Sequence, residues 1–84
     1  MKVAITGASH GLGEGLVNYF STNNHSVLEL RERIVNYQYN IVEKLEDSDV
    51  FINCSNSGDL QATLYTQVYQ AWQMQNKTIV NILT

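Results

Sequence analysis

The chain has 84 residues and a mass of 9.5 kDa, which limits it to one small domain spanning residues 1–84. A chain of this size buries only about 60–65% of the surface that its unfolded form exposes. Its core is therefore marginal unless a ligand or a partner chain adds to it. The single cysteine excludes an internal disulfide framework, and Cys54, His10 and His25 lack the paired spacing of a structural zinc site.

The charge balance also limits the class of protein. The net charge of −3 excludes the basic stripe that is typical of a nucleic-acid-binding domain. No apolar run is long enough to span a bilayer. Thr6, Ser9 and several glycines interrupt any secretory leader near the first residue. We therefore expect a cytoplasmic protein with neither a nucleic acid nor a membrane as its partner.

The first thirty residues predict a strand, a helix and a second strand. The apolar run 3–5 ends at a glycine and is typical of a buried parallel strand. Residues 12–20 predict a helix, which ends in the turn-forming stretch 21–26, where Asn23 and Asn24 indicate a helix stop. Residues 26–30 form the next strand candidate. The helix places four apolar residues on one face, namely Leu12, Leu16, Val17 and Phe20.

The segment that follows is ambiguous. Apolar and polar side chains alternate over residues 35–39, as in a strand. These residues follow the second strand too closely for a parallel crossover, which needs about a dozen residues. A strand there is antiparallel, irregular or absent. Asn40 followed by Glu43 fits a helix N-cap with its box partner, so we expect a short helix over residues 41–47. Helical spacing also relates four apolar residues of this segment, namely Ile34, Tyr37, Ile41 and Leu45.

The rest of the chain predicts a strand over 49–54, a long helix over 60–75 and a final strand over 78–83. Strands that alternate with helices imply βαβ units and a parallel sheet. We therefore expect an α/β fold, a minimal Rossmann-like three-layer domain with a mostly parallel sheet of four or five strands. The expected strand order is 2-1-4-5, with the third strand left open. The long helix has two adjacent apolar stripes, one of Leu64, Val68 and Ala71 and one of Tyr65, Tyr69 and Trp72.

A glycine-rich loop, TGASHGLG, follows the first strand and opens the first helix. Gly7 allows a tight turn, Gly11 lets the backbone approach a pyrophosphate, and Gly13 permits close packing of helix and strand. The first N–H groups of the helix face the anion, which the helix dipole also favours. The alternative is a glycine-rich turn with no ligand. The loop residues that we expect to bind a cofactor are Gly7, Ser9, His10, Gly11, Leu12 and Gly13.

The spacing Gly-x-x-x-Gly-x-Gly resembles the cofactor loop of the short-chain dehydrogenase/reductase family. Residues 49–56, DVFINCSN, resemble the strand that ends in an Asn-Asn-Ala-Gly segment in that family. Asn40 and Ile41 occupy the place of an acidic and an apolar residue that flank the adenine. The resemblance extends to 59–60 and 77–84 and thus covers the whole chain. It implies further contacts with adenine and ribose from Asn40, Ile41, Asn53, Cys54 and Ser55.

Several departures limit what this resemblance implies. The Tyr-x-x-x-Lys pair of the family is not found within the 84 residues. Asp59 replaces an expected Asn, and Thr84 stands where a catalytic serine is expected. The helix between the second and third strands is missing. The resemblance therefore implies the N-terminal cofactor-binding half of such an enzyme, with no catalytic residue assigned and no metal.

Arg31 lies at the end of the second strand, where an acid selects NAD and an arginine accepts the 2′-phosphate of NADP. The guanidinium pairs well with phosphate, and His10 and Arg33 add positive character, so we expect NADP rather than NAD. Glu29 and Glu32 flank Arg31 and oppose this choice. The plain alternative is a surface arginine.

Three functions remain open from the sequence: an NADP(H)-binding domain, a minimal NADPH-dependent oxidoreductase working as an oligomer, and a dinucleotide-sensing or scaffold protein. Cys54 ends a buried strand without a neighbouring base, so we interpret it as an unreactive pocket residue. The second apolar stripe of the long helix would be exposed on a monomer. Because exposed apolar patches mark association surfaces, we expect a homo-oligomer.

Overall fold

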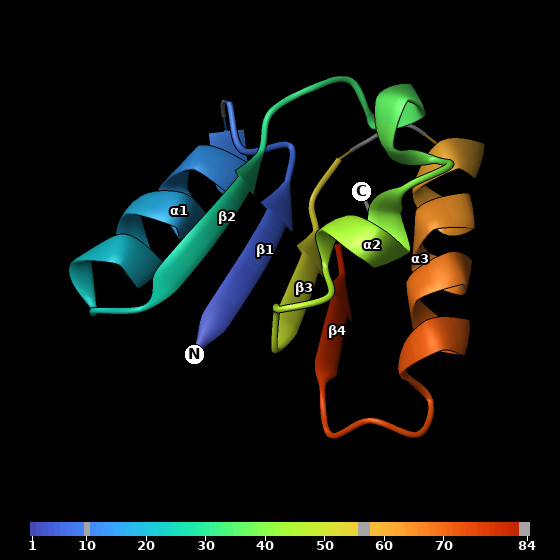
Figure 1. The fold of residues 1–84 in the computed structure, drawn as a ribbon. Helices are drawn as coiled ribbons and strands as arrows, with labels where there is room; N and C mark the ends of the chain where they lie inside the picture. Colours follow the sequence, from blue (N-terminus) through green and yellow to red (C-terminus); the bar gives the residue numbers. More distant parts are fainter. Residues whose placement is uncertain (10, 56–57, 83–84) are drawn as a thin grey trace.

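The computed structural model describes residues 1–9, 11–55 and 58–82, and Figure 1 shows their arrangement. Strands and helices alternate along the chain, as predicted. In chain order the elements are β1 (Lys2–Thr6), α1 (Gly11–Thr22), β2 (Ser26–Leu30), the 3₁₀ helix η1 (Ile34–Tyr37), α2 (Ile41–Lys44), β3 (Val50–Asn53), α3 (Asp59–Trp72) and β4 (Thr78–Asn81).

All four strands are parallel, and their order in the sheet is β2-β1-β3-β4. This is the predicted order 2-1-4-5 with the doubtful third strand absent. In the register of the sheet, Val3 pairs with Val27 of β2 on one side and Val50 of β3 on the other. The strand order thus reverses at β1, where parallel α/β sheets form a crevice at the carboxyl ends of their strands.

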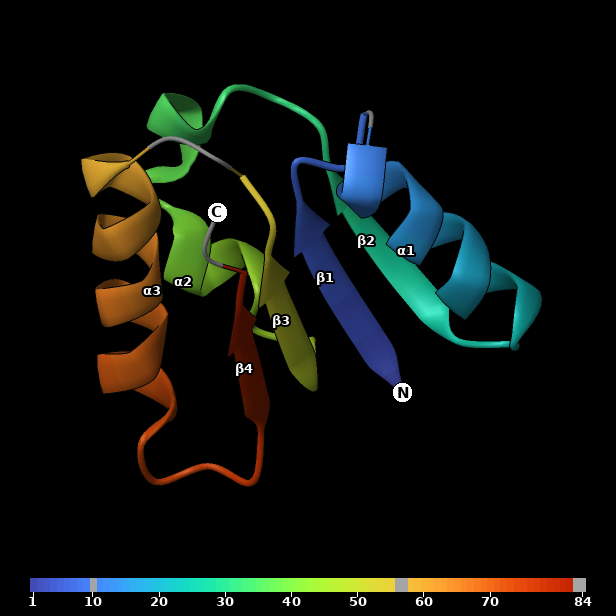
Figure 2. The same cartoon turned by 180° about the vertical axis from the view of Figure 1, so that it is seen from behind.

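The sheet is the middle of three layers, which confirms the predicted Rossmann-like architecture. α1 covers one face, and η1, α2 and α3 lie on the other (Figures 1 and 2). Because side chains of a strand alternate between faces, Val3 and Ile5 pack under α1 whereas Ala4 packs toward α3. All three are fully buried. Burial on both faces explains why β1 is an uninterrupted apolar run.

Helix α1 presents Val17 to the sheet, and Leu16 and Phe20 pack beside it half-buried. Asn24 adopts a left-handed conformation with φ 68° just beyond the helix, as expected of a stop signal. Leu12, which was predicted on the same face, is 57% exposed, so the buried part of this face does not extend to the first turn of α1. It lies in the first turn, one residue after the helix begins, where no other element covers it.

The segment between β2 and β3 departs most from prediction. The stretch 35–39 contains no strand: residues 34–37 form η1 and residues 38–40 a turn. Helix α2 ends at Lys44 instead of residue 47. The predicted capping box is wrong too, since Asn40 makes no side-chain bond to the helix. Packing determines this segment, because its four apolar residues are all buried in the core against α3, namely Ile34, Tyr37, Ile41 and Leu45.

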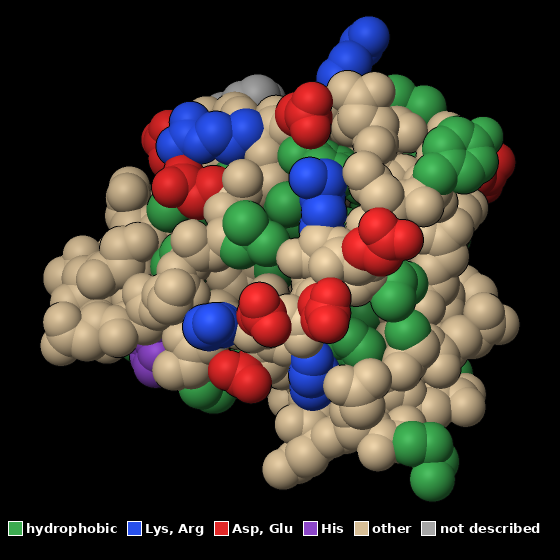
Figure 3. Space-filling model, in the orientation of Figure 1, with side chains coloured by type: hydrophobic (Ala, Val, Ile, Leu, Met, Phe, Trp, Pro, Cys, Tyr) green, Lys and Arg blue, Asp and Glu red, His purple; other side chains and the backbone are tan. Residues whose placement is uncertain are grey.

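Helix α3 ends three residues before the predicted position. Leu64 and Val68 are fully buried against the sheet, and Trp72 joins them in the core, whereas Tyr65 and Tyr69 remain exposed. Figure 3 shows few charged side chains on the right-hand flank, which α3 forms, apart from its upper end. Among the described helices, none is both long and apolar enough to cross a membrane.

Candidate functional site

A cleft of about 500 Å³ lies at the carboxyl ends of β1, β2 and β3, where the strand order reverses. This is the position at which open α/β sheets bind ligands. The glycine turn forms one wall, the chain after β2 forms a second, and Ser55 and the start of α3 form a third. The lining residues are Gly7, Ser9, Arg31, Glu32, Arg33, Ile34, Val35, Ser55 and Leu60.

Two glycines of the turn, Gly7 and Gly13, lie so close to neighbouring backbone that a side chain would collide with it or press against it. A Cβ on Gly13 would lie 1.9 Å from the carbonyl oxygen of Gly7, so no side chain fits there. Gly7 has φ +66°, and a Cβ there would lie 3.3 Å from the backbone nitrogen of Ser55. The turn therefore packs directly against the start of α1 and against the chain that leaves β3.

Gly11 differs from these two glycines. Its φ of +63° favours glycine, yet no atom lies within 4 Å of the place where a Cβ would stand. Helix α1 begins at this residue, so its first backbone N–H groups have no partner within the helix. The start of α1 thus offers backbone donors beside open space, which suits the close approach of an anion, although Gly11 itself is not among the residues that line the cleft.

A buried polar contact joins the turn to the end of β3. The Thr6 hydroxyl donates to the side-chain oxygen of Asn53 over 2.8 Å and accepts the backbone N–H groups of Cys54 and Ser55 at 3.0 and 3.2 Å. Thr6 and Asn53 are both buried. This contact fixes the Ser55 wall of the cleft relative to the glycine turn. The sequence analysis did not single out Thr6, although a polar residue ending a buried strand was the available signal.

Asn53 has a supporting position rather than a place on the cleft surface. Its amide donates to the backbone oxygen of Gln61 at 3.0 Å and to the side-chain oxygen of Asn81 at 3.1 Å. The Gln61 amide in turn donates to the backbone oxygens of Asn53 at 3.1 Å and Ile82 at 2.6 Å. These bonds join the ends of β3 and β4 to the first turn of α3. The sequence analysis missed Gln61, because a neutral polar residue on a helix gives no sign in the sequence that it is buried.

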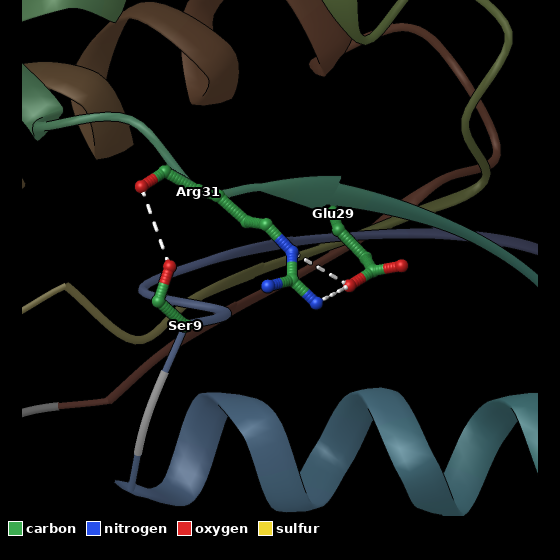
Figure 4. Close-up of polar contacts among 3 residues, drawn as sticks. All are labelled: Ser9, Glu29 and Arg31. Atoms are coloured by element: carbon green, nitrogen blue, oxygen red, sulfur yellow. Dashed lines mark hydrogen bonds and ion pairs between the residues drawn. The ribbon is translucent and has the colours of Figure 1, made fainter.

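Arg31 extends from the end of β2 beside the glycine turn, and its guanidinium pairs with Glu29 (Figure 4). The Arg31 Nε–H donates to Glu29 Oε1 over 2.9 Å, and Nη2 donates to the same oxygen. Ser9 Oγ donates to the backbone oxygen of Arg31 at 3.5 Å, which links the turn to β2. Both charged side chains are substantially exposed, so their pairing is weak and an incoming anion can displace it.

The wall after β2 combines charge with apolar surface. Ile34 and Val35 line the cleft beside Arg31 and Arg33, and Leu60 faces it from α3. The Tyr37 hydroxyl accepts the backbone N–H of Glu32 at 3.0 Å and so fixes this wall to the core. The sequence analysis did not predict apolar cleft residues here, because they belong to the irregular segment that it left open.

The remaining predicted site residues are dispersed. Ile41 is fully buried against α3, and neither it nor Asn40 lines the cleft. The side-chain oxygen of Asn40 is buried without a hydrogen-bond partner among the described residues. Leu12 is exposed at the start of α1, and His10 lies outside the described residues. Cys54 is half-buried beside the cleft, and burial raises the pKa of its thiol, which disfavours the reactive thiolate.

No protein-family model, curated protein or solved structure matches this chain. The fold is therefore established by its own topology, a four-stranded parallel sheet alternating with helices.

Proposed function

We propose that the protein binds NADP(H) in the cleft at the carboxyl ends of β1, β2 and β3. One observation supports this most strongly: Gly7 and Ser9 of the glycine turn line the same cleft as Arg31, and the turn leads into the start of α1 at Gly11, where a Cβ would meet open space. The pyrophosphate would lie on the turn of residues 7–13, where free N–H groups and the helix dipole favour negative charge.

The adenosine would occupy the wall after β2. Val35 and Leu60, with the small exposed part of Ile34, supply the apolar surface that an adenine ring needs, and Ser55 supplies a polar group on the same wall as Leu60. This differs from the contacts that the family resemblance implies, because Ile41 is in the core and cannot reach the ring. The cleft volume of about 500 Å³ is in the range of small-molecule sites.

The 2′-phosphate would lie near Arg31. Two N–H groups of its guanidinium donate to one oxygen of Glu29. A phosphate would offer the guanidinium a second, doubly charged partner. Arg33 lines the same wall and adds a second positive charge. We therefore propose NADP(H) as the preferred dinucleotide over NAD(H), with the protein acting as a binding domain.

Calorimetric titration with NADPH and NADH tests this proposal. We expect micromolar binding with NADPH preferred by about tenfold, the effect of one charge-assisted hydrogen-bonded contact. Arg31→Gln should remove the preference while leaving NADH binding unchanged. Gly11→Ala should weaken both dinucleotides by about tenfold or more, because its methyl group enters the space reserved for the phosphate.

Gly15→Ala is the matched control, since a Cβ on Gly15 also meets no atom within 4 Å but lies one turn into α1, away from the cleft. Circular dichroism of each variant separates loss of binding from loss of fold. Unchanged dinucleotide affinity in a folded Gly11→Ala protein, or no binding by the wild type, would contradict the proposal.

A further inference from the structure

Strand β4 is the last strand of the sheet, and no described strand pairs with its outer side. Its inner side bonds to β3, with the N–H groups of Thr78 and Ile82 donating to the oxygens of Asp49 and Asn53 at 3.0 and 3.1 Å. Since N–H groups alternate along a strand, those of Ile79 and Asn81 point to the open edge. The edge therefore offers two backbone donors and their neighbouring carbonyls for pairing.

This edge lacks the features that usually prevent edge-to-edge association. The sequence of β4, TIVN, contains neither charge nor proline. Ile79 packs toward α3, so Val80 points to the opposite face, where it is 37% exposed. The other edge strand, β2, contains Glu29, which is paired with Arg31.

Beyond its first residue, Asp59, the helix beside this edge is also uncharged. Residues 60–76 contain no Asp, Glu, Lys or Arg. A groove of about 320 Å³ runs between α3 and the start of β4, and its lining includes Tyr65, Tyr69 and Ile79. The two tyrosine rings stack with their centroids 6.0 Å apart. Figure 3 shows the same flank with few charged side chains.

Lys77 is the charged residue that precedes β4, and it turns back onto its own chain. Its Nζ donates to the backbone oxygen of Glu46 at 3.0 Å and lies 4.8 Å from the centroid of the Trp72 ring. Lys77 also lines the groove, and apart from it the surface formed by β4 and residues 60–76 has no charged side chain, on a chain whose net charge is −3. Two copies that meet here bring together one pair of lysines, each held by its own chain, whereas contact through the acidic remainder would bring together many like charges.

We propose that this surface is the interface of a symmetric homodimer, in which the β4 strands of two copies pair antiparallel. One register uses both outward N–H groups: Ile79 pairs with Asn81 of the second copy, and Asn81 pairs with its Ile79. That register places Val80 opposite Val80 of the second copy in a close, non-hydrogen-bonded pair. Two four-stranded sheets then join into one continuous sheet.

The symmetry of this pairing also accounts for the exposed tyrosines. Antiparallel pairing of identical strands has its two-fold axis perpendicular to the sheet, which makes the interface self-complementary. Both α3 helices then lie on the same side of the joined sheet, with their Tyr65 and Tyr69 sides facing each other. Aromatic side chains on a surface depleted of charge are typical of the centre of an interface.

Light scattering after size-exclusion chromatography tests the dimer. The wild type should have about twice the chain mass of 9.5 kDa. Val80→Lys should raise the dimer dissociation constant by at least about 100-fold, because it sets two lysines opposite each other at the centre of the pairing. Leu28→Lys is the matched control: Leu28 is 40% exposed on the other edge strand, and its variant should remain dimeric.

Hydrogen exchange of individual amides provides the second measurement. The N–H groups of Ile79 and Asn81 should be protected in the wild type and exchange rapidly in a folded Val80→Lys monomer. A wild type of 9.5 kDa at all concentrations would overturn the proposal. So would a dimer in which these two amides exchange freely, or one that Leu28→Lys dissociates as readily as Val80→Lys. Neither measurement depends on dinucleotide binding.

Discussion

At the scale of single residues, Gly13 has the strictest steric requirement in the glycine turn. Gly13→Ala would place a methyl group 1.9 Å from the Gly7 carbonyl oxygen, and only backbone movement relieves that contact. We expect the free energy of unfolding to fall by about 3 kcal/mol or more, which is the range of severe overpacking. Urea denaturation followed by circular dichroism measures it.

Gly15 provides the comparison for this effect. Gly15→Ala fills open space in the middle of α1, so the higher helix propensity of alanine should raise the free energy of unfolding by about 1 kcal/mol. If the two variants changed stability by the same amount, the close contact between Gly13 and Gly7 would not be the cause. Gly13 is required by close packing, whereas a Cβ on Gly11 would meet open space, so of these two glycines only Gly11 is suitable for testing the proposed ligand.

Thr6 is the second residue whose replacement should be costly. Thr6→Val keeps the shape of the side chain but leaves two backbone N–H groups and the Asn53 oxygen without their partner. Because Thr6 and Asn53 are buried and the two N–H groups are partly buried, we expect a loss of about 2–3 kcal/mol in thermal or chemical denaturation. Thr63→Val is the control, since the exposed Thr63 hydroxyl bonds only within α3, and it should change stability by less than about 0.5 kcal/mol.

At the scale of elements, hydrophobic periodicity predicted the strands well. The expected strand at 26–30 coincides with β2, and those at 3–5 and 49–54 lie within one residue of β1 and β3. β1 and β3 are short apolar runs ended by polar residues, so local sequence and final burial agree there, whereas β2 lies at the edge of the sheet and is mostly exposed. The expected strand at 78–83 corresponds to β4, although Leu83 lies outside the described residues.

The segment after β2 was not predictable in the same way. Asn40 has the residue type of a helix cap, yet its backbone has φ −138° and ψ 11° and its side chain turns inward. The burial of Tyr37 and Ile41 against α3 sets that geometry, and those contacts come from residues far along the chain. The same reason applies to the cleft: the glycine turn was visible in the sequence, whereas the wall of Ile34 and Val35 was not.

Tyr37 tests whether η1 supports the cleft. Tyr37→Phe removes the hydroxyl that accepts the N–H of Glu32 and leaves the packing of the ring in place. We expect a loss of about 1 kcal/mol in the free energy of unfolding and weaker NADPH binding, because the wall that contains Arg31 and Arg33 loses its attachment. Tyr39→Phe is the control, since Tyr39 is almost fully exposed. A Tyr37→Phe protein that is less stable but binds NADPH normally would show that the hydroxyl serves the core alone.

At the scale of the whole molecule, the stability of the small core depends on the two proposed partners, a dinucleotide and a second copy of the chain. A ligand that binds only the folded chain stabilises it by mass action, by about 2.7 kcal/mol at one hundred times its dissociation constant. Association of two folded copies likewise stabilises the folded chain. The two surfaces are separate, because the cleft lies at the carboxyl ends of the strands and the β4 edge lies along one side of the sheet.

The reversal of strand order at β1 also bears on how the chain folds. Each half of the sheet is a local unit, β1-α1-β2 and β3-α3-β4, and the strand pairing that joins them is that of β1 with β3. In that seam Val3 meets Val50, a contact between residues far apart in sequence, whose loop must close before the seam gains any energy. Non-local parallel pairing is intrinsically slow. The rate of folding should therefore depend on docking of the two halves along β1 and β3. The length of the irregular segment that connects the halves sets the size of the loop that must close before they dock.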